Sequence, residues 1–295
     1  MRDDEHDDFD PTDDEHDAYG PERFRKRPRR APRGRTHARD AVDDGTTDPG
    51  LAHLLASGVI SEVLGELKSG KEADVLLARG PHGLVALKAY RDPEAGGYRP
   101  DAIYLDGRRP PRGRLRKVLD RGARSGVPAE LALWVLHEVG TLWAMHDAGL
   151  PVPEPRIGPG AYDVARAGRM LPMAFVGEED GTPAPLLADA ALTPDAARVA
   201  WSHVVELAAD LLRAGWVHGD LSAWNLLWHR DRPVLIDVPQ AVRIESSPHA
   251  TELLARDVRS LLHSVASFGI EDDPVRLEAE LRTRAGLPPS GPLDR

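Results

Sequence analysis

An N-capped amphipathic helix that runs directly into two short strands is the feature that most limits how this chain can fold. Thr193 is a good N-cap residue, and Pro194 suits the first helical position, where a missing N–H breaks no hydrogen bond. Apolar residues then recur at helical spacing, and Gly215 supplies a C-terminal stop. The apolar positions are Val199, Val204, Leu207, Ala208, Leu211 and Leu212. The pattern predicts a helix over residues 193 to about 213.

The residues that follow predict a loop and a hairpin. Residues 226–228 read as one strand, residues 231–233 as a turn, and residues 234–236 as the next strand. The loop before the first strand carries the run His-Gly-Asp-Leu-Ser-Ala-Trp-Asn, which begins at His218. The second strand ends at Asp237. Polar residues are therefore expected at both ends of a short hairpin.

The spacing of three of these polar residues suits phosphoryl transfer. Asp220 stands five residues before Asn225, and Asp237 follows the second strand. Enzymes that transfer phosphoryl groups mainly position an attacking oxygen and neutralise charge through Mg²⁺. Mg²⁺ takes few oxygen ligands from the protein and keeps water and substrate phosphate for the rest. We expect Asp220 near the nucleophile, and Asn225 with Asp237 on the metal.

Each part of this pattern also has an ordinary structural explanation. A His-Gly-Asp triplet is commonly a turn, and an Ile-Asp pair is often only the exit of a strand. The combination with a preceding helix and two strands is improbable by chance, and it indicates a site. These three residues alone fit any kinase-like enzyme.

A glycine-bearing turn precedes this region by more than a hundred residues. Gly65, Gly70 and Lys71 match the spacing of a P-loop, but Glu72 stands where a P-loop has Ser or Thr, and a strand rather than a helix follows. We therefore predict a turn between two antiparallel strands. Its backbone N–H groups at Ser69 and Gly70 are expected to face nucleotide phosphates, because glycine allows close approach.

The next strand and helix supply a candidate ion pair. Residues 84–90 alternate apolar and other residues around Lys88. In kinases, a lysine on the third strand contacts the nucleotide phosphates and pairs with a glutamate of a helix. Residues 128–146 predict that helix, in which Glu138 is central, whereas Glu130 lies at the start, where an acid favours the helix dipole. Taken alone, Lys88 would more often be an exposed strand lysine, but the run that begins at His218 favours the site.

Charge is unevenly distributed along the 295 residues, whose formal net charge is −10. Residues 1–20 are rich in Asp and Glu, and a basic block extends from Arg23 to Arg39. Such segments bury too little apolar surface to fold, so a disordered arm is expected over residues 1–48. The basic block could bind RNA phosphates, or it could be only a solubilising tail.

The absence of cysteine and of long apolar runs bears on the compartment in which the protein is expected. The chain has no cysteine, which excludes disulfides and thiolate metal sites and fits a reducing compartment. No signal-peptide pattern and no apolar run long enough to cross a bilayer is visible. We expect cytoplasmic residence and no membrane partner. Residues 91–124 are basic and broken by Gly and Pro, and they predict a long, partly mobile loop.

Together these motifs resemble the RIO family of atypical protein kinases, and within it the first, RIO1-like branch. The matching runs are residues 58–62, 69–73, 86–90, 134–138, 218–227 and 236–242, with a late segment at residues 248–258. Two residues after the aspartate, RIO kinases carry serine, here Ser222. Conventional protein kinases carry lysine at that position, and many small-molecule phosphotransferases carry histidine. The metal-site run is Ile-Asp-Val instead of Asp-Phe-Gly, and no Ala-Pro-Glu motif follows.

The resemblance implies an α+β, truncated two-lobed protein-kinase-like fold. It implies an N-lobe of antiparallel sheet and helix over residues 49–177, and a mainly helical C-lobe over residues 178–280. The C-lobe would lack the usual peptide-binding subdomains. Residues 281–295 are expected to be a flexible tail. No N-terminal winged helix is visible, which argues against the second RIO branch.

Site roles follow from the resemblance. Lys88 would anchor phosphates, Asp220 with Ser222 would be catalytic, and Asn225 with Asp237 would hold Mg²⁺ or Mn²⁺. Asp237 could also accept phosphate as an aspartyl-phosphate. The residues implied in nucleotide binding are Ser69, Gly70, Lys71, Val75, Lys88, Glu138, Ala174, Val176 and Leu227.

Some residues depart from the family pattern. Ala174 replaces a usual hinge glutamate, Lys68 and Ser69 replace a Ser-Thr pair, and Pro239 replaces a serine. Adenine should still be recognised by backbone groups of Ala174 and Val176, because those groups do not depend on the side chain.

The favoured function is an ATP- and Mg²⁺-dependent serine/threonine protein kinase that acts on itself or on a protein substrate, with or without ATPase turnover. The alternative is a nucleotide-gated ATPase or assembly factor for the ribosome or RNA, because RIO proteins act in maturation of the small ribosomal subunit. The basic block would then reach ribosomal RNA or protein. A small-molecule phosphotransferase is disfavoured by Ser222 and by the missing helical substrate lobe.

Overall fold

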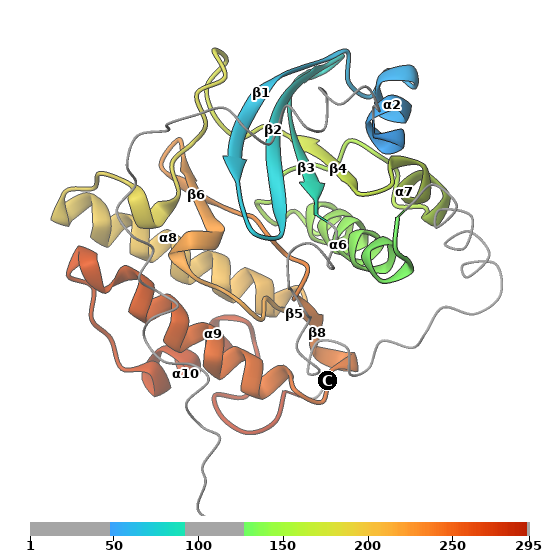
Figure 1. Cartoon of the computed structure of the whole chain (residues 1–295). Helices are drawn as coiled ribbons and strands as arrows, with labels where there is room; N and C mark the ends of the chain where they lie inside the picture. The colour runs from blue at the N-terminus through green and yellow to red at the C-terminus, as the bar shows by residue number, and fades with distance from the viewer. Residues whose placement is uncertain (1–47, 92–126, 294–295) are drawn as a thin grey trace, which may run out of the picture. The chain divides into compact units, whose positions relative to one another are not determined.

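Four antiparallel strands form one sheet in the order β1-β2-β3-β4. They are β1 (Glu62–Ser69), β2 (Ala73–Gly80), β3 (Gly83–Tyr90) and β4 (Met170–Ala174) (Figure 1). The computed structural model describes residues 48–91 and 127–293. In the first hairpin, Ser69 pairs with Asp74 beside the turn and Glu62 with Arg79 at the far end. The predicted glycine turn between antiparallel strands is therefore confirmed.

Helix α6 (Ala129–Asp147) lies beside the strands β3 and β4 in Figure 1 and contacts β4. It confirms the helix predicted over residues 128–146. Its buried apolar residues include Leu131, Val135, Val139, Leu142 and Met145. Because these residues face the core, Glu138 is carried inward on the same helix and is only 1% exposed.

The first described helix is attached to the sheet through its cap. Asp48 accepts hydrogen bonds from the N–H groups of Gly50 and Leu51 at the start of α2 (Pro49–Ala56). Its other carboxylate oxygen pairs with Arg169, at 2.6 Å, and Arg169 also donates to the carbonyl of Tyr90. Gly50 approaches α7 (Ala161–Ala167) so closely that a Cβ would lie 2.0 Å from the carbonyl oxygen of Ala167. Asp48, the last residue of the predicted arm, is therefore held in place by α2 and Arg169.

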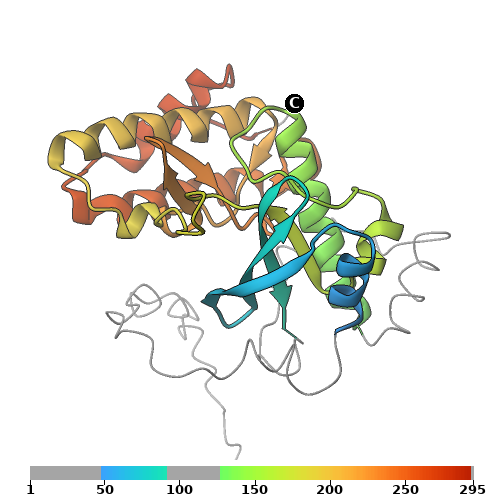
Figure 2. The same ribbon diagram turned by 90° about the horizontal axis from the view of Figure 1, so that it is seen from above.

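The C-terminal part is mainly helical. Its longer elements are α8 (Pro194–Arg213), β5 (Trp216–Val217), β6 (Leu226–His229), β7 (Arg232–Leu235), β8 (Val242–Arg243), α9 (Ala250–Val265) and α10 (Pro274–Arg284). Short 3-10 turns occur at Leu187–Asp189, Ala223–Asn225, Ile244–Ser246 and Ala266–Phe268. Figure 2 shows the β6–β7 hairpin alongside α8, in agreement with the contacts between α8 and β7.

Helix α8 begins and ends as its sequence predicts. The hydroxyl of Thr193 accepts the N–H of Ala196 at 3.2 Å, and Gly215 has a left-handed φ of 82° just beyond the helix end. Of the apolar positions proposed for its buried face, Val199 is the exception. It is 53% exposed, because it lies outside the stripe that continues through Val204 and Leu211.

The β6–β7 turn lies earlier than predicted. The two turn residues are Arg230 and Asp231, both with left-handed φ angles of 51° and 57°, and β7 already begins at Arg232. Two-residue turns with positive φ match the twist of hairpin strands. Pro233 lies in β7 opposite Trp228, so the assignment of Pro233 to the turn was wrong. Alternate residues of an antiparallel strand point their N–H away from the partner, so a proline is tolerated there.

The predicted flexible tail from residue 281 is wrong for residues 281–293. Helix α10 continues to Arg284, and Arg282 is 1% exposed between Glu278 and the carbonyl of Gly291. The N–H of Leu293 donates to Thr251 of α9. Specific polar contacts therefore fix this segment despite its Gly and Pro content.

Two predicted regions lie outside the described residues, namely residues 1–47 of the arm and most of the 91–124 loop. Among the helices that are described, none combines the length and the apolar character needed to cross a membrane.

Candidate active site

Lys88 is held between two carboxylates that come from distant parts of the chain. Its Nζ lies 2.8 Å from Oε1 of Glu138 on α6 and 2.8 Å from Oδ1 of Asp237, which follows β7. The side chain of Lys88 is 13% exposed and that of Glu138 1%. Burial opposes a charge on Lys88, but the two carboxylates outweigh it and raise the pKa of the ammonium. Lys88 is therefore a cation that is held in place between Glu138 and Asp237.

Burial raises the pKa of both acids, and Lys88 outweighs it only at Asp237. It raises the pKa of Glu138 to about 7, although Lys88 opposes the shift. Asp237 keeps 43% of its side chain exposed, and Lys88 holds the pKa of Asp237 below its usual value despite the opposing effect of burial. Asp237 is thus the acid of the pair that stays ionised and open to a ligand.

The backbone at Asp237 is in an uncommon conformation. Its φ of 64° lies in the left-handed region, which is rarely populated by residues other than glycine. Such conformations persist where the surrounding structure imposes them, and they concentrate at functional sites. The next residue, Val238, is fully buried and anchors the turn that presents the carboxylate.

The loop over residues 218–225, which is the predicted catalytic loop, brings Asp220 and Asn225 together. The Nδ2 of Asn225 donates to the backbone carbonyl of Asp220 at 2.8 Å and to its Oδ2 at 3.2 Å. The carbonyl of Asn225 accepts the N–H of Ile236, so Asn225 and Asp237 lie at the same open end of the β6–β7 hairpin. With its NH₂ facing Asp220, the amide of Asn225 presents its oxygen as an acceptor only. That is the ligand type which Mg²⁺ prefers.

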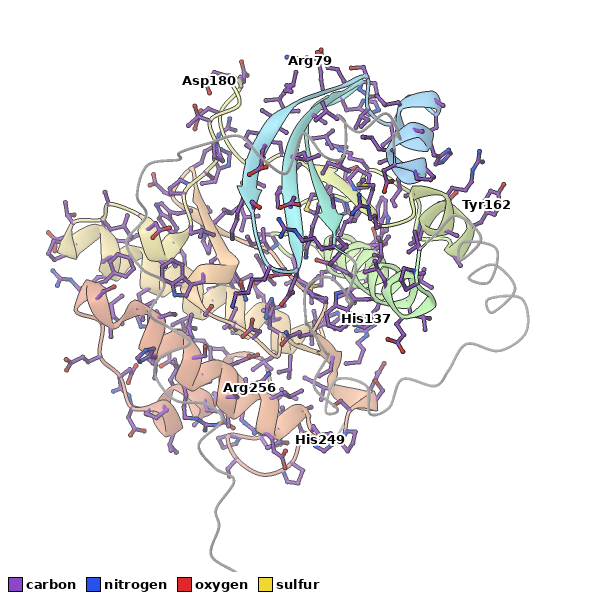
Figure 3. All side chains as sticks on the ribbon, viewed as in Figure 1. Arg79, His137, Tyr162, Asp180, His249 and Arg256 are labelled. Atoms are coloured by element: carbon purple, nitrogen blue, oxygen red, sulfur yellow. The ribbon has the colours of Figure 1, made fainter. Side chains whose placement is uncertain are left out.

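Helix α9 holds the backbone of this loop. The two carboxylate oxygens of Asp257 accept the N–H groups of Gly219, at 2.8 Å, and Leu221, at 2.9 Å. Ser264 accepts the N–H of Ala223 at 2.9 Å, and Arg256, labelled in Figure 3, donates to the carbonyl of Gly219. Three alternate residues of the loop are thereby fixed from one side.

None of these α9 contacts was assigned from sequence. The signal for Asp257 was present, since it lies within the late segment that resembles the RIO family and shares the buried face of α9 with Leu253, Leu254 and Leu261. A carboxylate among apolar helix positions indicates a buried acceptor with specific donors. Burial raises the pKa of Asp257 to about 7, against the effect of the two N–H groups.

His218, two residues before Asp220, is a buried neutral side chain. It is 1% exposed, and burial lowers its pKa to about 4. Its Nδ1 lies 3.2 Å from the backbone N of Asp220, which donates to it, so the proton of the neutral ring is on Nε2. His218 therefore shapes the loop from within.

The nucleotide loop differs in one respect from the prediction. The N–H of Gly70 donates to the carbonyl of Ala73 at 3.0 Å, so it closes the turn and is not offered outward as expected. The hydroxyl of Ser69 is also engaged, with Asp74 at 2.7 Å. Lys71 is exposed at the tip. Partial burial and the carboxylates of Asp237 and Asp220 raise the pKa of Glu72 in the turn.

The hinge residues Ala174 and Val176 follow the outer strand β4. Ala174 lies opposite Val85, yet its N–H donates to the carbonyl of Glu154 at 2.8 Å. The carbonyl of Val176 accepts the N–H of Ala184 at 3.1 Å. These contacts use one backbone group of each hinge residue, so adenine could be read only through the carbonyl of Ala174 and the N–H of Val176.

The other predicted residues occupy distinct positions. Val75 on β2 pairs with Lys88 on β3, so the two side chains lie on the same face of the sheet. Leu227 lies in β6 and forms a bridge with Leu186. Ser222 is 5% exposed, and its carbonyl accepts the N–H of Asn225, which begins the 3-10 turn of the loop.

The donor set suits a metal bound by few protein ligands. Across residues 48–91 and 127–293, no three or more His, Asp or Glu side chains are grouped to hold a metal ion. Asn225 and Asp237 supply one amide and one carboxylate. Mg²⁺ commonly takes one or two protein oxygens, with water and substrate phosphate completing the shell.

The chain is similar to known proteins over most of its length. A sequence model of the RIO domain matches residues 116–276. The chain is 32% identical over 247 residues to the serine/threonine-protein kinase RIO1 of Caenorhabditis elegans, covering 83% of this chain and 45% of that protein. It is 30% identical over 241 residues to serine/threonine-protein kinase RIO1 of Homo sapiens, covering 79% and 39%. It is 32% identical over 235 residues to the RIO-type serine/threonine-protein kinase Rio1 of Haloferax volcanii, covering 79% and 73%.

The chain spans less than half the length of its relatives from Caenorhabditis elegans and Homo sapiens. The match to the RIO domain extends from before α6 to the start of α10, and it includes Glu138, the catalytic loop and Asp237. The fold agrees, since an N-terminal four-stranded antiparallel sheet precedes a helical part. The chain belongs to the RIO domain family, with its kinase-like fold, and is a distant relative of the RIO1 atypical serine/threonine kinases.

Proposed function

We propose that this protein is an ATP- and Mg²⁺-dependent serine/threonine protein kinase that phosphorylates itself or a protein partner. The observation that carries the proposal is the position of Lys88, whose ammonium joins Glu138 of α6 to Asp237 after β7. A cation fixed in this way can hold nucleotide phosphates next to the metal-binding carboxylate.

The geometry assigns a task to each residue of this proposal. Lys88 binds phosphate oxygens and stays charged, because its neighbours raise its pKa. The amide oxygen of Asn225 and the carboxylate of Asp237 would hold Mg²⁺, which when bound neutralises charge on the transferred phosphoryl group. Asp220, oriented by the NH₂ of Asn225, accepts the proton of the attacking hydroxyl.

The domain division follows the same proposal. Residues 49–177 form the nucleotide-binding N-lobe, and residues 178–280 form a truncated C-lobe without the usual peptide-binding subdomains. Adenine binds at Ala174 and Val176, and Ser69, Lys71, Val75 and Leu227 line the nucleotide site. Asp237 is a second phosphate acceptor, because its carboxylate is ionised and partly exposed. Cytoplasmic residence stays a prediction.

The proposal is tested by following labelled phosphate from ATP with Mg²⁺. The wild type should carry label on serine or threonine, or as acyl-phosphate on Asp237, and Asp220→Ala and Asp237→Ala should abolish the transfer. Asp195→Ala is the matched control, because Asp195 is an exposed carboxylate paired only with Arg198 of the same helix in the contacts described. Unchanged labelling in both site variants would contradict the proposal.

A second candidate is a nucleotide-gated ATPase that assembles with ribosomal RNA or protein. It is favoured by the basic block from Arg23 to Arg39, which lies outside the described residues. Phosphate contacts make association strongly salt-dependent. Label found only as free phosphate, together with RNA or ribosome association that loses its salt dependence when residues 1–48 are deleted, would favour this candidate over the first.

A further inference from the structure

Three side chains form a hydrogen-bonded cluster at the base of the β1–β2 turn. Nη2 of Arg91 lies 2.6 Å from Oδ1 of Asp74 and 2.8 Å from the hydroxyl of Ser69. Nε of Arg91 lies 3.2 Å from Oδ2 of Asp74, so the guanidinium meets both carboxylate oxygens. The hydroxyl of Ser69 lies 2.7 Å from Oδ1 of Asp74. One residue each from β1 and β2 is thus joined to the residue that follows β3.

Backbone hydrogen bonds continue this cluster into the turn. The N–H of Arg91 donates to the carbonyl of Glu72 at 2.8 Å, and the N–H of Gly70 donates to that of Ala73 at 3.0 Å. A Cβ on Gly70 would lie 2.9 Å from the carbonyl oxygen of Ala73, so a larger residue at this position would force the turn to shift. Arg91 therefore fixes the turn through its backbone and through its side chain.

The cluster changes what Ser69 can do. A hydroxyl has one hydrogen to donate, and that of Ser69 goes to Asp74, while the oxygen accepts from Arg91. The hydroxyl of Ser69 is therefore engaged in shaping the loop and has no hydrogen left to donate to phosphate. The turn still lies near Lys88, because Val75, three residues after Glu72, pairs with Lys88 across β2 and β3. The carboxylates of Asp237 and Asp220 also raise the pKa of Glu72.

We propose that Arg91 is a positioning residue, which acts through Asp74 and Ser69 to set the nucleotide loop for binding the phosphates of ATP. The inference rests on the proposed function, since it names a further residue of the same nucleotide site. Arginine suits the role because its planar fork bonds a carboxylate at two points, which the single ammonium of lysine cannot do.

The test compares the affinities of Arg91→Met for ATP and for adenosine. Arg79→Met is the matched control, because Arg79 makes the other side-chain pair between β1 and β2, 3.0 Å from Glu62 at the end of the hairpin away from the turn (Figure 3). In Arg91→Met, we expect the dissociation constant for ATP to rise about tenfold, by the loss of a charge-assisted network. The constant for adenosine should stay unchanged, and Arg91→Lys should be intermediate.

Two further variants separate loop positioning from direct contact. If Arg91 acts through the loop, Asp74→Ala should weaken ATP binding as Arg91→Met does, and the double variant should add little. If ATP affinity is retained in Asp74→Ala but lost in Arg91→Met, the guanidinium binds phosphate itself and the inference is overturned. Equal weakening of adenosine and ATP in Arg91→Met, or an equal loss in Arg79→Met, overturns it as well.

Failure of the inference can be told from failure of the proposed function. Binding is measured without any transfer step, so the wild-type labelling result decides the function on its own. A wild type that transfers phosphate while Arg91→Met binds ATP normally contradicts the inference alone. A wild type that transfers nothing while Arg91→Met loses ATP selectively contradicts only the kinase proposal.

Discussion

The ammonium of Lys88 lies 2.8 Å from a carboxylate oxygen of Glu138, which is 50 residues later in the sequence. Glu138 is almost completely enclosed, and Lys88 has a second partner in Asp237. Glu138 therefore orients Lys88, and Asp237 would still pair with the ammonium if Glu138 were neutralised. Removing one partner of a buried ion pair usually destabilises a protein more than the pair itself contributes.

Glu138→Gln keeps the shape of the side chain and removes its charge. We expect the free energy of unfolding to fall by about 1–3 kcal/mol, less than for a pair without a second partner, and phosphate transfer to fall at least about tenfold. Urea unfolding and label transfer measure both effects. Glu154→Gln, which removes a partly exposed partner of Arg156, should change neither. Wild-type transfer by Glu138→Gln would show that Lys88 needs no such partner.

His218 predicts a loss of stability in acid. Its pKa is about 4 in the folded protein and 6.5 as the ordinary value, so between these values the unfolded chain binds a proton that the folded one excludes. Stability from this group is complete above pH 6.5 and is lost as the pH falls toward 4. The total is at most about 3 kcal/mol.

His218→Gln isolates this effect, because the amide oxygen can accept the N–H of Asp220 but does not titrate. Asp257, with its raised pKa, acts in the opposite direction over the same range and is common to both proteins. The stability advantage of the wild type over His218→Gln should therefore shrink as the pH is lowered. Unfolding free energies measured from pH 7 to pH 4 check this, and parallel curves would rule it out.

Asp257 should be less replaceable than Ser264. Both oxygens of Asp257 accept backbone N–H groups, whereas an asparagine would turn its NH₂ toward one of those donors. We expect Asp257→Asn to lose about 1–3 kcal/mol of unfolding free energy and much of the transfer rate. Ser264→Ala removes one acceptor and should have a smaller effect on both measurements. The reverse order would mean that α9 does not hold the loop through Asp257.

The part of the fold that the sequence predicted is governed by local signals. Thr193, Pro194 and Gly215 mark the ends of α8 in the chain itself, and the alternation around Lys88 marks β3. The β6–β7 turn was misplaced because Pro233 is a strong turn signal, yet it occupies a strand position that needs no donor. Local chemistry alone did not show which N–H groups the ladder uses.

The parts of the site that were missed depend on distant contacts. Arg91 and Asp257 act on backbone groups or side chains that lie many residues away, and no periodicity or short motif records such a partner. Gly70 was predicted to face phosphate because glycine permits close approach, but its N–H closes the turn on Ala73. The residue types predicted where the loop lies, but only its hydrogen bonds show which groups of the loop are already paired within the protein.

Tyr90 offers a test of how the charge of Lys88 is supported from its own strand. The Nζ of Lys88 lies 4.8 Å from the centre of the Tyr90 ring, and the buried hydroxyl of Tyr90 has no hydrogen-bond partner among the described residues. Tyr90→Phe should keep the wild-type transfer rate and at least its stability, because it removes an unpaired polar atom. In Tyr90→Leu the free energy of unfolding should fall by about 0.5–2 kcal/mol, because the aromatic ring beside the ammonium is lost, and phosphate transfer should slow. Equal loss in both variants, measured by unfolding and labelling, would assign the role to the hydroxyl.

The most direct test of the account separates binding from transfer in Asp220→Asn. This variant keeps an oxygen that can accept from Asn225 but loses the base. ATP affinity, measured by calorimetry with Mg²⁺, should stay within about threefold of the wild type, while label transfer from ATP should fall about 100-fold or more. Transfer at the wild-type rate by folded Asp220→Asn would contradict the assignment of this loop as the catalytic centre.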